Sequence, residues 1–179
     1  MKGRSFSLKP FSSAGLPPYL EITGDIGRSS NKLSISYTLS GPLAELVVPA
    51  HADLRLRKNG LWEETCFEFF LGPVNSGHYW EFNLSTSGNW NVYRFTSCRQ
   101  GMQEETAFTA LPFSVQVHSG SLQLSLEVEL DKLVPTDQDL KIGISAVIKT
   151  INGSMTFWAL THPGPEADFH RRDAFIIDL

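Results

Sequence analysis

Carboxylate, amide and aromatic side chains alternate along short segments in the centre of the chain. Residues 66–71 read CFEFFL and residues 79–84 read YWEFNL. Successive side chains of a β-strand point to opposite faces, so residues two apart share a face. If both segments are strands, Glu68, Tyr79, Glu81 and Asn83 fall on one face, opposite a face of Phe, Trp and Leu. In this arrangement one face is polar and the other belongs to the core.

A third segment, residues 90–96 (WNVYRFT), extends both faces. We place Tyr93 and Phe95 in the apolar row, which brings Trp90 and Arg94 to the polar face. That face then combines hydrogen-bonding groups with flat rings. Sugars present hydroxyl groups, which need donors and acceptors, and C–H faces, which pack on aromatic rings. The pattern therefore predicts a site for a small polar ligand, most simply a carbohydrate.

Two other interpretations of this face stay open. It is also what a solvated sheet face with ordinary cross-strand pairs looks like. Glu68 and Glu81 on adjacent strands could instead be the carboxylate pair of a glycoside hydrolase, although a salt bridge from either one to Arg94 or Arg99 is the more common arrangement. Whether the protein is an enzyme stays undecided, and a binding role is favoured because no nucleophile-elbow, phosphate-loop, dinucleotide or zinc-protease motif is present.

The elements that would position these residues are short strands separated by turns. The Gly72-Pro73 pair follows the first central segment, and Ser119-Gly120 and Asn152-Gly153 separate β-rich runs as hairpin turns would. We expect an all-β antiparallel sandwich or jelly roll with little helix, formed as a single domain over residues 1–179.

Composition agrees with this fold class and excludes several functions. The 179 residues include 12 Phe, 4 Trp and 4 Tyr beside 14 Gly and 10 Pro, and only 19% are charged. The aromatic content argues against disorder. A net charge of −4 argues against a nucleic-acid binder, which usually carries a basic patch. We therefore expect no nucleic-acid partner.

The sequence also predicts where the protein is located and the redox state of its two cysteines. No apolar run of signal-peptide length precedes Pro10, and none approaches the ~20 residues of a membrane span. We therefore expect a cytoplasmic protein without a membrane partner. Cys66 and Cys98 lack zinc-ligand spacing, and reduced thiols are expected in that compartment.

Four segments together resemble the DOMON-like proteins related to family 9 carbohydrate-binding modules. They are LWEETCFEFFLGP from Leu61, YWEFNLSTSGNWNVYRF from Tyr79, SCRQGM from Ser97 and HPGPEADFHRRDAFIIDL from His162. Each motif alone is weak, but the combination is specific. The resemblance implies a β-sandwich that holds its ligand with aromatic and polar residues. Related domains bind sugars or haem, so the resemblance implies the fold more firmly than the ligand.

Two positions depart from the pattern. Thr86 stands where the group has proline, which softens that turn. Cys98 stands where the group has tyrosine, which would remove an aromatic wall.

The Pro- and Gly-rich segment before the C-terminus adds candidates. Asp168 and His170 share one side of an extended chain and could ligate a metal, but we favour hydrogen bonds that shape the rim of the site. No ligand spacing in the sequence supports a calcium site. Haem would need Met102 or His170 as its axial ligand, and no pattern specifies either. We therefore expect no cofactor. A site that has lost its ligand, leaving an interaction module, remains a further alternative. The predicted ligand-binding residues are Trp62, Glu68, Tyr79, Glu81, Asn83, Trp90, Arg94, Arg99, Asp168 and His170.

Overall fold

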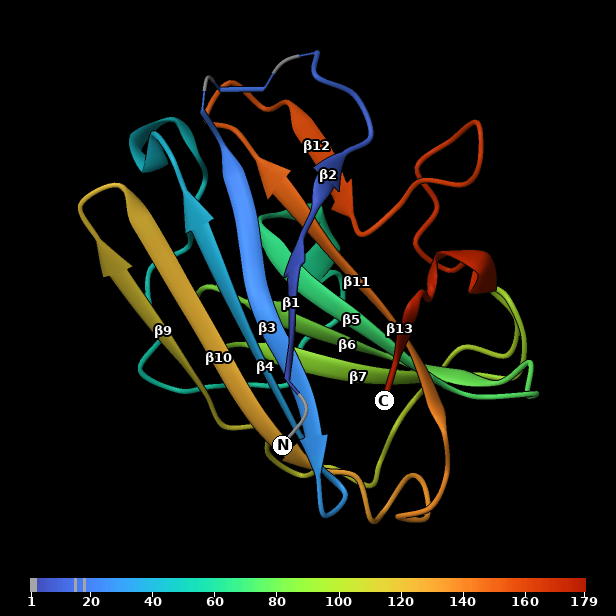
Figure 1. The fold of residues 1–179 in the computed structure, drawn as a ribbon. Helices are drawn as coiled ribbons and strands as arrows, with labels where there is room; N and C mark the ends of the chain where they lie inside the picture. The colour runs from blue at the N-terminus through green and yellow to red at the C-terminus, as the bar shows by residue number, and fades with distance from the viewer. Residues whose placement is uncertain (1–2, 15, 18) are drawn as a thin grey trace.

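Two antiparallel β-sheets lie face to face in the computed structural model, which describes residues 3–14, 16–17 and 19–179 (Figure 1). Sheet A has the strand order β1-β3-β4-β10-β9, and sheet B has the order β2-β12-β11-β5-β6-β7-β8, with β13 paired to β11. Every strand pair is antiparallel. The predicted antiparallel β-sandwich with little helix is confirmed.

The strands of sheet A are β1 (Arg4–Ser7), β3 (Glu21–Ser29), β4 (Lys32–Ser40), β9 (Phe113–His118) and β10 (Ser121–Glu129). Those of sheet B are β2 (Lys9–Pro10), β5 (Cys66–Pro73), β6 (Tyr79–Ser85), β7 (Trp90–Phe95), β8 (Gln103–Glu104), β11 (Leu140–Lys149), β12 (Met155–Ala159) and β13 (Ile177–Asp178). Three short 3-10 helices complete the described elements: η1 (Leu43–Glu45), η2 (Leu61–Glu63) and η3 (Arg172–Ala174). Among the described residues no helix has the length and apolar character needed to cross a membrane.

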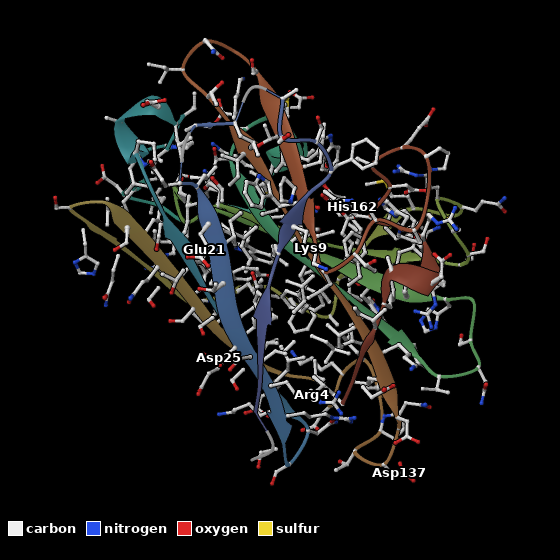
Figure 2. The ribbon with its side chains drawn as sticks, turned by 45° about the horizontal axis from the view of Figure 1, so that its top comes forward. Arg4, Lys9, Glu21, Asp25, Asp137 and His162 are labelled. Atoms are coloured by element: carbon white, nitrogen blue, oxygen red, sulfur yellow. The ribbon has the colours of Figure 1, made fainter. Side chains whose placement is uncertain are left out.

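The main core fills the space between the sheets. Inward side chains of β4 and β10 alternate with polar ones that are mostly half-buried on β4 and mostly exposed on β10, as expected for a sheet with one solvated face. On sheet B, Phe69 of β5 stacks on Phe82 of β6 with ring centroids 4.4 Å apart. Trp80 lies in this core, as predicted from its face of residues 79–84, and so does Trp158. Figure 2 shows the interior filled by side chains from both layers.

Tight turns set the strand register. Gly120 and Gly153 adopt positive φ angles of 84° and 89° in the two predicted hairpins. A third two-residue turn, between β3 and β4, uses Ser30 and Asn31 at φ 48° and 60°. The sequence did not indicate this turn, because neither residue is glycine.

Sheet B is buried on its outer face as well, which sheet A is not. All eight residues of β5 and all seven of β6 are buried. A second, smaller cluster of Phe70, Tyr79, Tyr93, Phe95 and Phe175 lies on this face, with Phe169 packed against it. The C-terminal segment after β12 covers these strands, and Figure 1 shows it in red, with η3, beside β5, β6 and β7.

Two strand glycines make room for that segment. A Cβ atom on Gly143 of β11 would lie 2.7 Å from Cδ1 of Phe175, closer than real Cβ contacts come. Gly72 of β5 similarly leaves space for the guanidinium of Arg172, which also lies 4.8 Å from the Phe175 ring centroid. At the start of the segment Nε2 of His162 is 2.8 Å from the carbonyl oxygen of Lys9, and Figure 2 labels both residues.

Candidate functional site

A cavity of about 530 Å³ opens on the outer face of sheet B. We call it the outer cavity. Strands β5, β6, β7, β11 and β12 form its floor, while η2, the loop after β7 and the C-terminal segment form its walls. Its polar lining residues are Glu63, Glu68, Glu81, Arg99 and His170, and its apolar ones are Trp62, Phe95, Met102, Val147, Met155, Phe157, Ala167 and Phe169. The volume is within the usual range for small-molecule sites.

Glu68 and Glu81 lie on the floor of the outer cavity, as neighbouring strands require. Glu68 pairs with Asn83 across β5 and β6, and Glu81 pairs with Phe70, so the two carboxylates are diagonal neighbours. They are only 2% and 4% exposed. Burial disfavours the charged form of a carboxyl, and it is the first cause of both shifts. It raises the pKa of Glu81 to about 7, and together with the nearby Glu81 charge it raises the pKa of Glu68 well above its ordinary value.

The direct hydrogen-bond donors to these carboxylates are neutral. Ser145 of β11 donates its hydroxyl hydrogen to Oε2 of Glu68 at 3.1 Å, and Asn83 donates from its side-chain amide to Oε1 of Glu81 at 2.9 Å. Asn83 is itself fully buried and does not line the cavity. Its effect on the site is to orient Glu81.

His170 connects the floor to the wall. Its Nε2 is 3.7 Å from Oε2 of Glu81, and its Nδ1 is 2.7 Å from the hydroxyl oxygen of Tyr79. That hydroxyl accepts the backbone N–H of Arg99 at 3.1 Å and has its own hydrogen to donate to Nδ1 of His170. When it does so, the proton of a neutral His170 ring is on Nε2 and faces Glu81. Burial, followed by the charge of Arg99, lowers the pKa of His170 to about 4, so the ring is neutral at pH 7.

Arg99 and Asp168 form a pair at the rim. Nε and Nη2 of Arg99 donate to Oδ1 of Asp168 at 3.1 and 2.8 Å, and the same oxygen accepts the backbone N–H of His170. Arg99 has a positive φ of 55°, which is uncommon for a residue with a side chain. The pair ties the loop after β7 to the C-terminal segment. Asp168 was predicted to shape the rim, whereas Arg99 was predicted to bind the ligand or to pair with Glu68 or Glu81.

Two of the predicted site residues lie elsewhere, because the face assignment of residues 90–96 was wrong. Trp90 pairs with Leu84 on the inner face of sheet B and is 2% exposed in the main core, with the guanidinium of Arg57 4.3 Å from its ring. Arg94 also points away from the cavity, and its guanidinium donates to Oε1 of Gln103. The residues that do reach the outer face are Tyr93 and Phe95.

The other predicted residues are brought together. Trp62 lines the cavity from η2, half exposed, with its ring 5.9 Å from that of Tyr93. Tyr79 is buried behind the wall, stacked on Phe95 at 4.8 Å. Both acids and His170 line the cavity, and Arg99 and Asp168 lie at its rim.

Several wall residues were not predicted, including Phe157, Phe169, Met102 and Met155. Phe157 could have been found, because it is adjacent to Trp158, and neighbouring residues of a strand face opposite sides. Phe169 depends on the path of the C-terminal segment, which no local pattern reveals.

His170 was a candidate ligand for haem or, with Asp168, for a metal. Both ring nitrogens of His170 face protein groups, Tyr79 and Glu81, so the ring is not free to act as an axial ligand. Within the part of the chain that the structure describes, no group of three or more His, Cys, Asp or Glu side chains could hold a metal ion. Both cysteines are free thiols, Cys66 buried and Cys98 exposed.

Solved structures with a similar fold include proteins described as carbohydrate-binding. A protein from Bacteroides uniformis, provisionally described as carbohydrate-binding, superposes with a TM-score of 0.67 at 12% identity, covering 96% of this chain and 83% of that one. A family 9 carbohydrate-binding module from Caldicellulosiruptor kristjanssonii, solved in complex with glucose, gives a TM-score of 0.53 at 9% identity over 88% of this chain and 76% of that one.

The fold is related to that of family 9 carbohydrate-binding modules. At these identities the likeness concerns the fold. No protein-family model and no curated protein matches the sequence significantly. The resemblance predicted from the four motifs is therefore confirmed for the family 9 fold.

Proposed function

We propose that the protein binds a carbohydrate in the outer cavity. The observation that carries the proposal is the combination of a floor with two buried carboxylates, Glu68 and Glu81, and walls with the exposed rings of Trp62 and Phe157. Carboxylates accept hydrogen bonds from sugar hydroxyls, and aromatic rings pack on sugar C–H faces. The fold neighbours are described as carbohydrate-binding, and one holds glucose.

The space near Trp62 favours a ligand longer than one ring. A second, more open hollow adjoins the outer cavity and shares Trp62, Glu63 and Met102 with it. Asn59, Tyr93 and Glu104 supply polar groups there. A sugar in the outer cavity could therefore continue into this hollow as a short oligosaccharide.

Isothermal titration calorimetry with glucose and short glucans tests the proposal. Trp62→Ala and Phe157→Ala each remove an exposed wall ring and should weaken binding about fivefold, since one stacked ring contributes on the order of 1 kcal/mol. Tyr19→Ala is the matched control, because Tyr19 is 94% exposed and does not line the cavity. The proposal fails if no sugar binds, or if the wall variants and the control behave alike.

A hydrolase is the second candidate, and one observation favours it. Glu81 has a pKa raised to about 7 by burial, which suits a general acid, and Glu68 shares its cavity. Turnover of nitrophenyl glycosides by the wild type, abolished in Glu81→Gln, would establish catalysis. Binding without turnover would support the module.

A further inference from the structure

The floor of the outer cavity has two carboxyl groups that no charged basic side chain in the described part of the chain contacts directly. Glu68 and Glu81 receive hydrogen bonds from the neutral groups of Ser145 and Asn83. Among the described residues, Oε1 of Glu68 receives no hydrogen bond, although that side chain is only 2% exposed. Because Glu68 lines the cavity, this oxygen is open to a hydrogen-bond donor of a ligand.

The basic groups around the cavity are engaged elsewhere. Arg99 directs its guanidinium to Asp168. Lys149 donates its ammonium hydrogen to the backbone carbonyl of Glu63 at the rim, where Glu63 adds a third carboxylate. His170 faces Glu81 but is neutral at pH 7, because burial lowers its pKa to about 4.

The phenols near the floor are neutral too. Burial raises the pKa of Tyr79 and of Tyr93 to about 12. The thiol of Cys66, also on this face, has a pKa raised by burial. None of these groups supplies a positive charge, and Arg99 acts on the two carboxyls only from a distance. A ligand cation in contact with both carboxyls would therefore supply an interaction that the protein lacks, and would favour their ionised form.

The walls suit a cation as well. The rings of Trp62, Phe95, Phe157 and Phe169 line the same cavity, and aromatic faces attract an ammonium group through their quadrupoles. An ammonium ion has three donors and can serve two carboxylates at once. A neutral sugar has no charge to offer them.

We propose that the carbohydrate bound in the outer cavity is an amino sugar, whose protonated primary amine is taken up by the carboxylates of Glu68 and Glu81. This inference rests on the proposed function and narrows it to one class of ligand. The hydroxyl groups and the ring of the amino sugar would contact the same walls and rim as those of any other sugar.

The charge requirement makes binding depend on pH. The pKa of Glu68 is raised well above its ordinary value, and its protonated carboxyl can still accept a hydrogen bond from the amine through its free oxygen. The ionisation that binding requires is then that of Glu81, so binding lowers the pKa of Glu81 from about 7 and releases a proton. The affinity for an amino sugar should fall by up to about tenfold for each unit of pH below 7. A neutral sugar needs no such ionisation and should lack this dependence.

Calorimetry on the full chain tests the proposal with glucosamine, glucose and N-acetylglucosamine at pH 7.0 and pH 5.5. We expect glucosamine to bind at least tenfold more tightly than the other two at pH 7.0, and less than threefold more tightly at pH 5.5. Titrations in buffers of different ionisation enthalpy should show proton release with glucosamine. This measurement needs no variant.

Variants assign the effect to the floor. Glu81→Gln keeps an oxygen that accepts the Asn83 hydrogen bond and removes the charge, so the ratio of the glucosamine and glucose affinities should fall toward one. Glu127→Gln is the matched control, because Glu127 is an exposed residue of β10 in sheet A. It should leave that ratio unchanged.

The outcomes separate this inference from the proposed function. Glucosamine binding no tighter than glucose overturns the amino-sugar inference and leaves carbohydrate binding standing. No measurable binding of any of the three sugars, nor of short glucans, overturns both. Methylammonium binding as tightly as glucosamine overturns the sugar part of the inference, because the cation alone would then be the ligand.

Discussion

Nε2 of His170 lies 3.7 Å from Oε2 of Glu81, where the C-terminal segment meets the floor of the outer cavity. The two groups respond oppositely to burial, which raises the pKa of Glu81 to about 7 and lowers that of His170 to about 4. Between these values the two side chains avoid an ion pair and favour a neutral contact. The floor is therefore held in its least charged state until a ligand or a higher pH ionises it.

Glu81→Gln should change how stability depends on pH. The folded protein holds the Glu81 proton up to pH 7, whereas the unfolded chain releases it near the ordinary value of 4.5. The wild type therefore loses stability as pH rises from about 4.5 to about 7, by on the order of 3 kcal/mol, and stays at that level above pH 7. The variant lacks this loss, so it should become more stable than the wild type as pH rises.

Urea unfolding of both proteins at pH 4.5, 6, 7 and 8 measures this difference. His170 acts in the opposite direction, since its lowered pKa adds stability as pH rises from about 4 to 6.5. The contribution of His170 to the free energy of unfolding is present in both proteins, so it cancels when the free energy of one is subtracted from that of the other. A difference between the two free energies that stays constant with pH would contradict the prediction.

Trp90→Ala and Trp62→Ala should have different effects on stability. Trp90 is 2% exposed in the main core, and its truncation should cost about 3–5 kcal/mol of unfolding free energy. Trp62 is 37% exposed at the cavity wall, so its truncation should cost less than about 1 kcal/mol. Thermal or urea unfolding measures both, and equal losses would show that Trp62 is a structural residue.

Sequence patterns predicted the central strands and two hairpins of this fold correctly. The strands at 66–71 and 79–84 and the hairpins at Gly120 and Gly153 follow from alternation and turn chemistry, and the structure has them within two residues. The faces of β5 and β6, including Glu68 and Glu81, are also as predicted. Local rules were sufficient there because each segment has one clearly aromatic face.

Trp90 was misplaced because both faces of β7 are apolar. Alternation identifies a core face only when the other face is solvated. Here the outer face is covered, by Trp62 of η2 over Tyr93 and by His170 of the C-terminal segment over Phe95. The wall residue Phe169 depends on the same segment, which is about 75 residues away in sequence from β7. Long-range packing, rather than local propensity, decides these positions.

Gly143→Ala should displace the segment that carries His170. The added methyl group would lie 2.7 Å from Cδ1 of Phe175, and the strand backbone on one side and the ring on the other leave it little room. Overpacking of this kind costs about 1–3 kcal/mol. Hydrogen exchange should become faster in residues 168–175 but not in the strands of sheet A.

Gly153→Ala serves as its contrast in the same experiment. A Cβ there meets nothing within 4 Å, but the φ of 89° strains it. Its effect should stay near the β11–β12 hairpin and leave residues 168–175 protected. If both variants loosen the C-terminal segment equally, the contact between Gly143 and Phe175 does not hold it.

Tyr79→Phe should loosen the loop that carries Arg99 and should remove the preference of His170 for one tautomer. The phenol accepts the N–H of Arg99 and lies 2.7 Å from Nδ1 of His170, so its removal leaves two partly buried polar groups without this partner. The cost should be about 1–3 kcal/mol of unfolding free energy. Nitrogen NMR should show His170 protonated on Nε2 in the wild type and a mixture of both tautomers in the variant. If Tyr79 only fills space, the variant loses stability but His170 keeps its tautomer. An unchanged His170 spectrum would therefore contradict this role of Tyr79.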